Sequence, residues 1–205
     1  MDLNLLVAEA RDMMGDDPAH DFAHVMRVYE NAKDMCKKDG IDPTLALCAA
    51  LFHDVVSYPK SDPRSEDSAA QSAQKAKPVL QRHGLTQEEI SIVAGAIRDH
   101  SFSRRIVPHT VTGKILQDAD RLDALGAIGV ARAFATGGML RRPLYNPDDP
   151  FCRDRNPDDS EWTVDHFFKK LLTLESQMNT DAGRTEAKKR TAFLKEFLAC
   201  LECEI

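Results

Sequence analysis

Apolar positions recur with the period of an α-helix along most of the chain. Residues 21–40 end in a basic turn followed by a glycine, which is the usual signal for the end of a helix. Asp42 and Pro43 then occupy the cap and first-turn positions of a further helix. No alternating run that would indicate a β-strand extends beyond a few residues. The pattern therefore predicts an all-α fold.

The second half of the pattern is also helical. A polar helix is predicted from about Ser68 to His83, closed by Gly84, and a capping box from Thr86 to Glu89 opens the next one. A long helical segment is predicted over 112–138. Residues 139–163 hold four prolines and form a long irregular stretch, a length typical of functional lids and mobile linkers. Two last helices are predicted at 164–178 and 182–205.

Length and charge narrow the function classes. A chain of 205 residues can bury a full core, so one domain is expected over 1–205, with a core at about 20–135 and helices of 161–203 packed on it. The formal charge of -6 argues against a nucleic-acid polymer as partner. A small anionic substrate would need only a local basic pocket.

The cysteines and the apolar runs bear on location. Five scattered cysteines favour reduced thiols over a disulfide framework, and Cys200 and Cys203 alone resemble a metal-binding pair that has no second pair. No apolar run approaches the ~18 residues of a membrane span, and the start of the chain lacks the basic region of a signal peptide. We therefore expect a soluble, cytoplasmic protein with no membrane partner.

One histidine–aspartate pair follows a very apolar helix. Residues 43–52 are almost wholly apolar, so His53 and Asp54 are expected to lie inside the protein. A buried ionised carboxylate costs several kcal/mol, as an order of magnitude, unless it is paired, hydrogen-bonded or bound to a metal. Asp54 therefore needs a partner.

Other polar residues can be sorted by helix face. His20, His24 and Arg27 share a stripe with Asn31, which lines a pocket or forms a solvated face. Asp118 and Asp120 lie roughly 160° apart around their helix, so they are not expected to bind one ion together.

Asp120 lies on a largely apolar stripe and is the preferred metal ligand, whereas Asp118 is an outer partner or a surface charge. His100 extends a core-facing stripe, for which a core histidine is the commoner explanation. Three histidines are left out of the candidate site: His83, His109 and His166.

Four pieces of the chain together resemble the HD superfamily of metal-dependent phosphohydrolases. They are "HDFAHVMRV", "LFHDVVSYPKSDPR", "IRDHSFS" and "ILQDADRLDALGAIGVARAF", which contain that family's order H…HD…D. More narrowly, nearly the whole chain resembles YedJ-like stand-alone bacterial HD proteins. The resemblance implies that the predicted single domain is an HD-domain helical bundle.

The resemblance also implies a metal site. One divalent cation (Mn, Fe, Co, Ni, Zn or Mg) would be held by His24, His53, Asp54 and Asp120. His100 would be a ligand of a second metal, as in some family phosphodiesterases. A bound cation lowers the pKa of a water ligand and polarises a phosphoryl oxygen.

Basic residues near the HD pair are candidates for substrate binding. Lys60 and Arg64 follow the pair in a loop, and Arg27 and His20 project from another helix; the alternative is exposed loop charges. The departing oxygen needs a proton or a positive neighbour, so the catalytic candidates are Asp54, His100 and Lys60.

The resemblance implies hydrolysis of a phosphomonoester or phosphodiester of a small phosphorylated metabolite, with a nucleotide as the preferred candidate. Ser57 replaces the glutamate of the deoxynucleotide monophosphatase branch, and the signatures of the cyclic-di-GMP and alarmone branches are absent from the sequence. Two alternatives are open: a non-catalytic metal- or nucleotide-binding regulator, and a helical domain whose His and Asp residues only pair internally.

Overall fold

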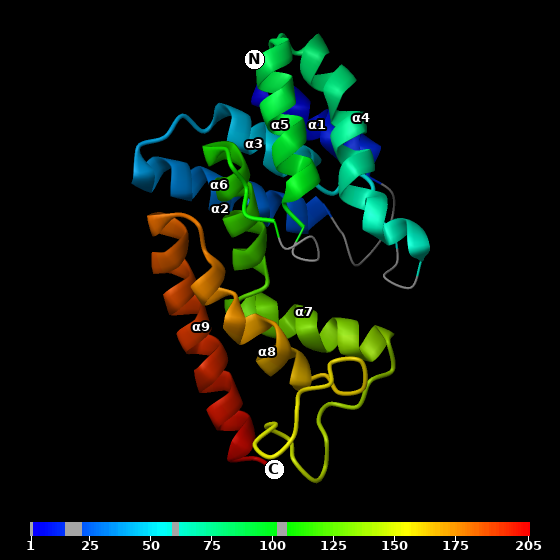
Figure 1. The fold of residues 1–205 in the computed structure, drawn as a ribbon, viewed down its shortest axis with the longest axis vertical. Helices are drawn as coiled ribbons and strands as arrows, with labels where there is room; N and C mark the ends of the chain where they lie inside the picture. The colour runs from blue at the N-terminus through cyan, green and yellow to red at the C-terminus, as the bar shows by residue number, and fades with distance from the viewer. Residues whose placement is uncertain (1, 15–21, 59–61, 102–105) are drawn as a thin grey trace. The chain divides into compact units, whose positions relative to one another are not determined.

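The computed structural model describes residues 2–14, 22–58, 62–101 and 106–205, and within these ranges it contains helices and no strands, which confirms the all-α prediction (Figure 1). The described part of the chain forms two compact units, residues 1–120 and 121–205. The prediction of one domain over 1–205, with the C-terminal helices packed on its core, stays a prediction. The α-helices are α1 (Leu3–Met13), α2 (Phe22–Asp39), α3 (Thr44–Phe52), α4 (Ser68–Arg82), α5 (Gln87–Asp99), α6 (Val111–Asp123), α7 (Gly126–Met139), α8 (Asp165–Lys169) and α9 (Asp181–Glu202).

The first unit is organised around α3. Every residue of this helix from Ala46 to Phe52 is buried, which is expected of a helix that is apolar on all sides. It packs against α1, α2 and α5, and α4 packs on α5 (Figure 1). The residues that directly follow α3, beginning with His53, are therefore placed in the interior of this unit.

The predicted helix ends in this unit are present, except that α3 begins one residue later than predicted, with Pro43 instead of Asp42 at the cap position. Gly40 and Gly84 adopt left-handed φ angles of +66° and +86° at the ends of α2 and α4, a conformation that glycine adopts without steric cost. The Asp42 side chain accepts a hydrogen bond from the Thr44 amide at 2.8 Å. The capping box predicted from Thr86 to Glu89 is present at the start of α5.

The prediction of one long helix over 112–138 is wrong, because the chain turns between α6 and α7. Just after α6 the chain makes a tight turn, in which the Leu125 amide donates a hydrogen bond to the Leu122 carbonyl at 3.1 Å. Leu125 is extended, and Gly126 follows with a φ of +66°. A Cβ at Gly126 would lie 3.3 Å from the Cγ of Arg190, so the turn requires a small residue with left-handed freedom.

The helix predicted over 164–178 is also broken. The α-helix α8 ends at Lys169, and two 3-10 helices continue the segment, η4 (Leu171–Thr173) and η5 (Glu175–Gln177). Lys170 leaves the helical region, with φ -131° and ψ -61°. The apolar spacing that suggested an α-helix is still used, because five of its side chains are buried: Val164, Phe167, Leu171, Leu174 and Met178.

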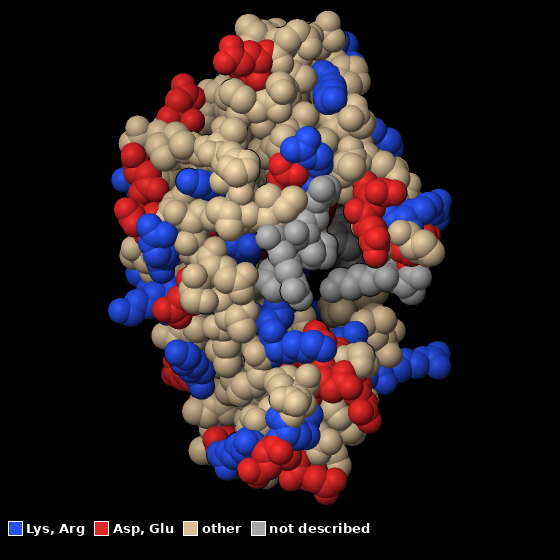
Figure 2. Space-filling model, in the orientation of Figure 1, with Lys and Arg blue, Asp and Glu red and all other residues tan. Residues whose placement is uncertain are grey.

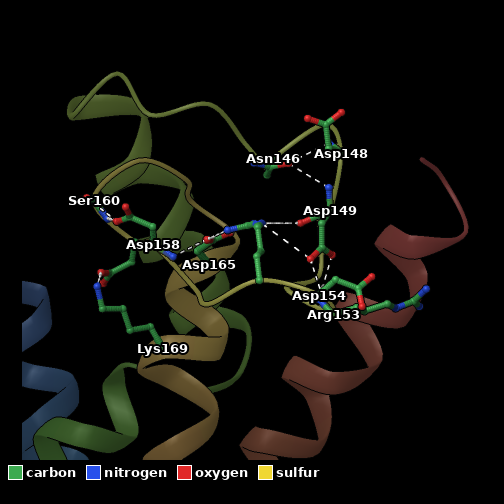
Figure 3. A network of polar contacts seen from close by, with 11 residues as sticks. Asn146, Asp148, Asp149, Arg153, Asp154, Asp158, Ser160, Asp165 and Lys169 are labelled. Atoms are coloured by element: carbon green, nitrogen blue, oxygen red, sulfur yellow. Dashed lines mark hydrogen bonds and ion pairs between the residues drawn. The ribbon is translucent and has the colours of Figure 1, made fainter.

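The irregular stretch 139–163 is held by polar contacts within the second unit (Figure 3). The Asn146 side chain accepts hydrogen bonds from the amides of Asp148 and Asp149 at 2.9 and 3.0 Å. The Asp149 carboxylate in turn accepts from the amides of Arg153 and Asp154. The absence of helix was predicted correctly, and the stretch has its own hydrogen-bonded framework.

In the view of Figure 2, acidic and basic side chains are interspersed over the surface and do not form a basic face.

None of the helices in the described ranges is long and apolar enough to cross a membrane. No disulfide joins the five cysteines, all of which lie in the described ranges, and Cys36 and Cys48 are buried.

Candidate metal centre

The HD pair lies in the turn that follows α3. His53 is completely buried and caps the end of this helix, and Asp54 follows with 19% of its side chain exposed. A serine on α4 holds this turn in place. The Ser72 hydroxyl accepts a hydrogen bond from the Val56 amide at 3.0 Å and donates one to the Val56 carbonyl at 3.3 Å, a pair of bonds that we call the Ser72 clamp. The apolar helix and this clamp together place two polar side chains inside the first unit.

Two further candidate ligands arrive on α2 and α6. His24 is in the first turn of α2, on the same side as the buried Val28, and is itself 2% exposed. Asp120 is near the end of α6, with 27% of its side chain exposed. The Asn31 side chain on α2 donates to the carbonyl of Ala119 at 3.2 Å, which joins the two helices beside Asp120.

The predicted ligands converge. The Nε2 atoms of His24 and His53 are 3.2 Å apart, and the Nε2 of His24 lies 3.7 Å from an oxygen of Asp54 and 3.5 Å from one of Asp120. The Nε2 of His53 lies 3.6 Å from Asp54. His100 joins from the end of α5, with its Nε2 at 3.8 Å from the other oxygen of Asp54.

Two groups of side chains in this cluster could hold a metal ion. One comprises His24, His53 and Asp120, and the other comprises His53, Asp54 and His100; in each, the donor atoms lie within 4.8 Å of one another. His53 belongs to both. Asp120, the residue preferred from the sequence, belongs to the first group, and Asp118 belongs to neither. Asp118 is fully buried, which excludes a surface charge.

The orientation of two imidazoles suits metal binding. The Nδ1 atoms of His53 and His100 lie 2.8 and 2.6 Å from the backbone carbonyls of Ala50 and Ile97. A carbonyl only accepts, so Nδ1 carries the proton and donates, and a neutral ring then presents the lone pair of Nε2 to the cluster. A backbone partner of this kind commonly fixes the tautomer of a metal-binding histidine.

The charges in the cluster are shifted in the matching direction. Burial alone would raise the pKa of Asp54, but the imidazoles of His53, His100 and His24 together hold it below its ordinary value. Burial, aided by the neighbouring His53, lowers the pKa of His100. At neutral pH the site therefore combines a carboxylate with a neutral imidazole, which are the protonation states that metal ligation requires.

The donor set as a whole fits a divalent first-row cation. Imidazole nitrogens and carboxylate oxygens are the ligands of Zn, Fe, Mn, Co and Ni, and carboxylates also suit Mg. The described cluster supplies three of the former and two of the latter. Since these side chains fit several metals equally, they do not select one.

Of the four predicted substrate-binding residues, the structure describes Arg27 and Arg64. His20 and Lys60 lie outside the described residues. Arg27 is three residues after His24 on α2, is partly buried, and lies on the same side of the helix.

Arg64 is exposed and already has partners in its own loop. Its guanidinium forms an ion pair with Asp62 at 2.7 Å and lies over the ring of Tyr58, 4.4 Å from the centroid. The side-chain hydrogen bond from Arg64 lowers the pKa of Asp62 to about 2. A phosphate would have to compete with this carboxylate or use the remaining donors of the guanidinium.

The three histidines left out of the site are elsewhere. His83 contacts Glu9 at 2.8 Å, His166 contacts Asp159 at 2.8 Å, and His109 is exposed. The sequence reasoning missed the clamp residue Ser72. The sequence feature that could have indicated it is a hydroxyl on the same helix face as the small apolar residues Ala69 and Ala76. That face is buried in the structure.

Known proteins are similar to this chain over most of its length. A family model described as HD domain matches residues 21–125, slightly more than half of the chain. The uncharacterized protein YpgQ of Bacillus subtilis (strain 168) is 34% identical over 194 residues, which covers 93% of this chain and 86% of YpgQ.

Solved structures match almost the whole chain. The crystal structure of Bacillus subtilis YpgQ in complex with ADP superposes with a TM-score of 0.75 at 29% identity, covering 98% of this chain and 94% of that one. An HD-superfamily hydrolase from Bacillus thuringiensis gives a TM-score of 0.76 at 31% identity, covering 98% and 95%.

Proposed function

The chain belongs to the HD-domain family, and from this premise we propose that it is a metal-dependent phosphohydrolase acting on a small phosphorylated metabolite of the nucleotide class. The reaction is hydrolysis of a phosphomonoester or phosphodiester bond. The observation that carries the proposal is the convergence of four side chains on one place: Asp54 and Asp120 each lie beside His24, and His53 lies beside His24 and Asp54, with donor atoms 3.2–3.7 Å apart in these four pairs.

The relatives support the class of reaction and of ligand. The Bacillus thuringiensis neighbour is named as a hydrolase, and YpgQ was crystallised with ADP. A nucleotide is an anion that a protein of net charge -6 would bind through a local site. A metal centre with basic residues beside it is such a site.

Each residue of the cluster has a role in the proposal. His24, His53, Asp54 and Asp120 hold one divalent cation. When bound, that cation supplies Lewis-acid chemistry, because it acidifies water and neutralises phosphoryl charge. The pKa of Asp54 is held below its ordinary value, so its carboxyl group is ionised at neutral pH.

His100 is the proton acceptor of the proposal, or a ligand to a further cation. Its Nδ1 proton is held by the carbonyl of Ile97, so its Nε2 is the atom that faces Asp54 and takes up a proton. The lowered pKa of this ring keeps Nε2 unprotonated at neutral pH.

Basic side chains bind the phosphate in this proposal. Arg27 extends from α2 one turn beyond His24, and Arg64 from the 3-10 helix η2 (Pro63–Asp67) that follows the HD turn. His20 and Lys60, which lie outside the described residues, complete the predicted set, with Lys60 assigned to the departing oxygen. Arginine suits this task because its planar fork matches phosphate oxygens.

A substrate screen tests the function. The purified chain is loaded in turn with Mn, Co, Ni, Zn, Fe(II) and Mg and offered nucleoside mono-, di- and triphosphates and phosphodiesters. We expect phosphate or nucleotide release with at least one metal, its loss in Asp54→Asn, and its retention in Asp149→Asn, which alters a carboxylate of the second unit.

Failure to turn over any compound with any metal would contradict the proposal. If nucleotides then raised the melting temperature of the metal-loaded chain without being hydrolysed, the regulatory alternative would replace it.

A further inference from the structure

A buried glutamine closes the end of the helix that carries His100. Gln117 lies on α6 and is 1% exposed. Its Nε2 is 2.9 Å from the carbonyl of Ile106, 3.4 Å from that of His100 and 3.5 Å from that of Asp99. The last carbonyls of a helix have no partner within it, so a buried amide beside them satisfies groups that would otherwise be costly to bury.

This contact connects two parts of the candidate metal centre. Gln117 precedes Asp120 by three residues, which places both on the same side of α6. The glutamine contacts the main chain of His100, while the His100 ring is turned by its own bond to the Ile97 carbonyl. The backbone that presents His100 is thus held at a fixed distance from the helix that presents Asp120.

Asn31 makes the corresponding connection to the other imidazole. It lies two helical turns after His24 on α2, and its side chain donates to the carbonyl of Ala119, the residue before Asp120. Two side-chain amides therefore bind α6 near Asp120. One connects it to the helix of His24 and the other to the end of the helix of His100.

We propose that Gln117 and Asn31 are positioning residues of this centre, with Gln117 setting His100 and Asn31 setting His24 relative to Asp120. Neither side chain is a ligand in this role. The expected effect on metal binding rests on the proposed function. The positions of the imidazoles can be measured without any metal. Ligand placement within a fraction of an ångström matters for affinity, and residues that orient ligands typically contribute tenfold to a hundredfold.

The first arm of the test uses the metal-free full-length protein. Nitrogen-15 labelled histidine reports the tautomer and environment of each ring at mildly alkaline pH, where imidazoles are neutral. Gln117→Met keeps the length of the side chain and removes its amide. We expect it to shift the His100 ring signals or split them between tautomers.

His53 is the internal control in the same spectrum. Its Nδ1 is held by the carbonyl of Ala50 on α3, so its tautomer should stay the same in both variants. Its ring lies against those of His100 and His24, with centroids 5.1 and 5.2 Å apart, so the tautomer of His53 is the control and its chemical shift is not. Asn31→Leu, similar in shape and without the amide, should give the reciprocal result: displaced His24 signals and unchanged His100 signals.

The second arm measures Co²⁺ affinity and the visible spectrum of the bound ion. We expect each variant to bind Co²⁺ at least tenfold more weakly than the wild type, with altered absorption. Val79→Ala, a truncation in the core of α4, is the control for lost stability; it should melt at a lower temperature yet bind Co²⁺ as the wild type does.

The outcomes separate the two claims. If the wild type binds Co²⁺ and the variants keep both its affinity and its histidine spectrum, the positioning role is wrong and the proposed function stands. If the wild type binds no Co²⁺ while the reciprocal histidine shifts occur, the metal centre is wrong and the positioning role stands. Equal shifts of all rings in both variants would reduce the two amides to general packing.

Discussion

Carboxylates in the two units of the chain have different partners. In the second unit, buried Asp165 pairs with the guanidinium of Arg155 and accepts from the amide of Asp158 at 2.6 Å (Figure 3). Asp159 pairs with Lys169 at 2.7 Å. In the first unit, Asp54 has three imidazoles around it, at 3.6–3.8 Å.

The difference distinguishes carboxylates whose charge is permanently neutralised within the fold from one whose charge can be balanced in more than one way. Arginine and lysine are protonated at all physiological pH values, so they neutralise a carboxylate permanently. An imidazole does so only when it is protonated, and two of the three near Asp54 hold their Nδ1 protons on backbone carbonyls. The charge of the Asp54 cluster is therefore balanced by an exchangeable proton or by a cation, which makes this cluster the chemically variable one.

The largest expected effect is on metal affinity in the first unit. Asp54→Asn removes a charged ligand, so we expect Co²⁺ affinity to fall on the order of 1000-fold, about 4 kcal/mol. The unfolding free energy of the metal-free protein should change by less than about 1 kcal/mol, because the amide can donate to the same imidazoles. Titration calorimetry and urea unfolding measure the two quantities.

A next test breaks the corresponding carboxylate of the second unit. Asp165→Asn leaves Arg155 without its buried partner, so we expect a loss of about 3 kcal/mol in stability. Co²⁺ affinity should be unchanged. Urea unfolding followed by the fluorescence of Trp162, the single tryptophan of the chain, measures the first effect. A variant that lost metal affinity and kept its stability would reverse the distinction between the two regions.

The smallest effect is a pH dependence in the second unit. Burial would raise the pKa of Asp159, but Lys169 and His166 lower it from 3.8 to about 2. A depressed folded-state pKa stabilises the protein above the unfolded value of 3.8 and stops doing so as the pH falls through about 2. Partial exposure screens the ion pairs, so we expect Asp159→Asn to cost about 1 kcal/mol near neutral pH.

Acid titration of that difference is the measurement. The gap in unfolding free energy between wild type and Asp159→Asn should shrink as the pH falls from about 4 to about 2. A gap that stays constant over this window would mean that the carboxylate contributes through packing instead of charge.

Much of the fold could be predicted because its signals are local. Gly40 and Gly84 end helices through left-handed φ, and the capping box at Thr86 begins one. The break at Gly126 could not be predicted in the same way, since a glycine inside an apolar helical pattern is often tolerated. Its function as a turn depends on the approach of Arg190 from a helix more than sixty residues away in sequence.

The site was predictable as far as its residue types and helix faces allowed. The apolar run before His53 required that it be buried, and helical geometry separated Asp120 from Asp118. The clamps at Ser72 and Gln117 were not predictable, because their importance lies in which backbone groups they meet across the fold. Hydrogen bonds of this kind leave no periodic pattern in a sequence.

The most direct test of the central claim is the metal content of the chain. Wild type, His24→Ala and Asp120→Asn are exposed to each plausible divalent metal, dialysed and analysed for bound metal per chain. We predict about one equivalent in the wild type with at least one metal, and none in either variant although both remain folded. No retained metal in the wild type, or equal retention in all three proteins, would contradict the convergence of these side chains on a cation.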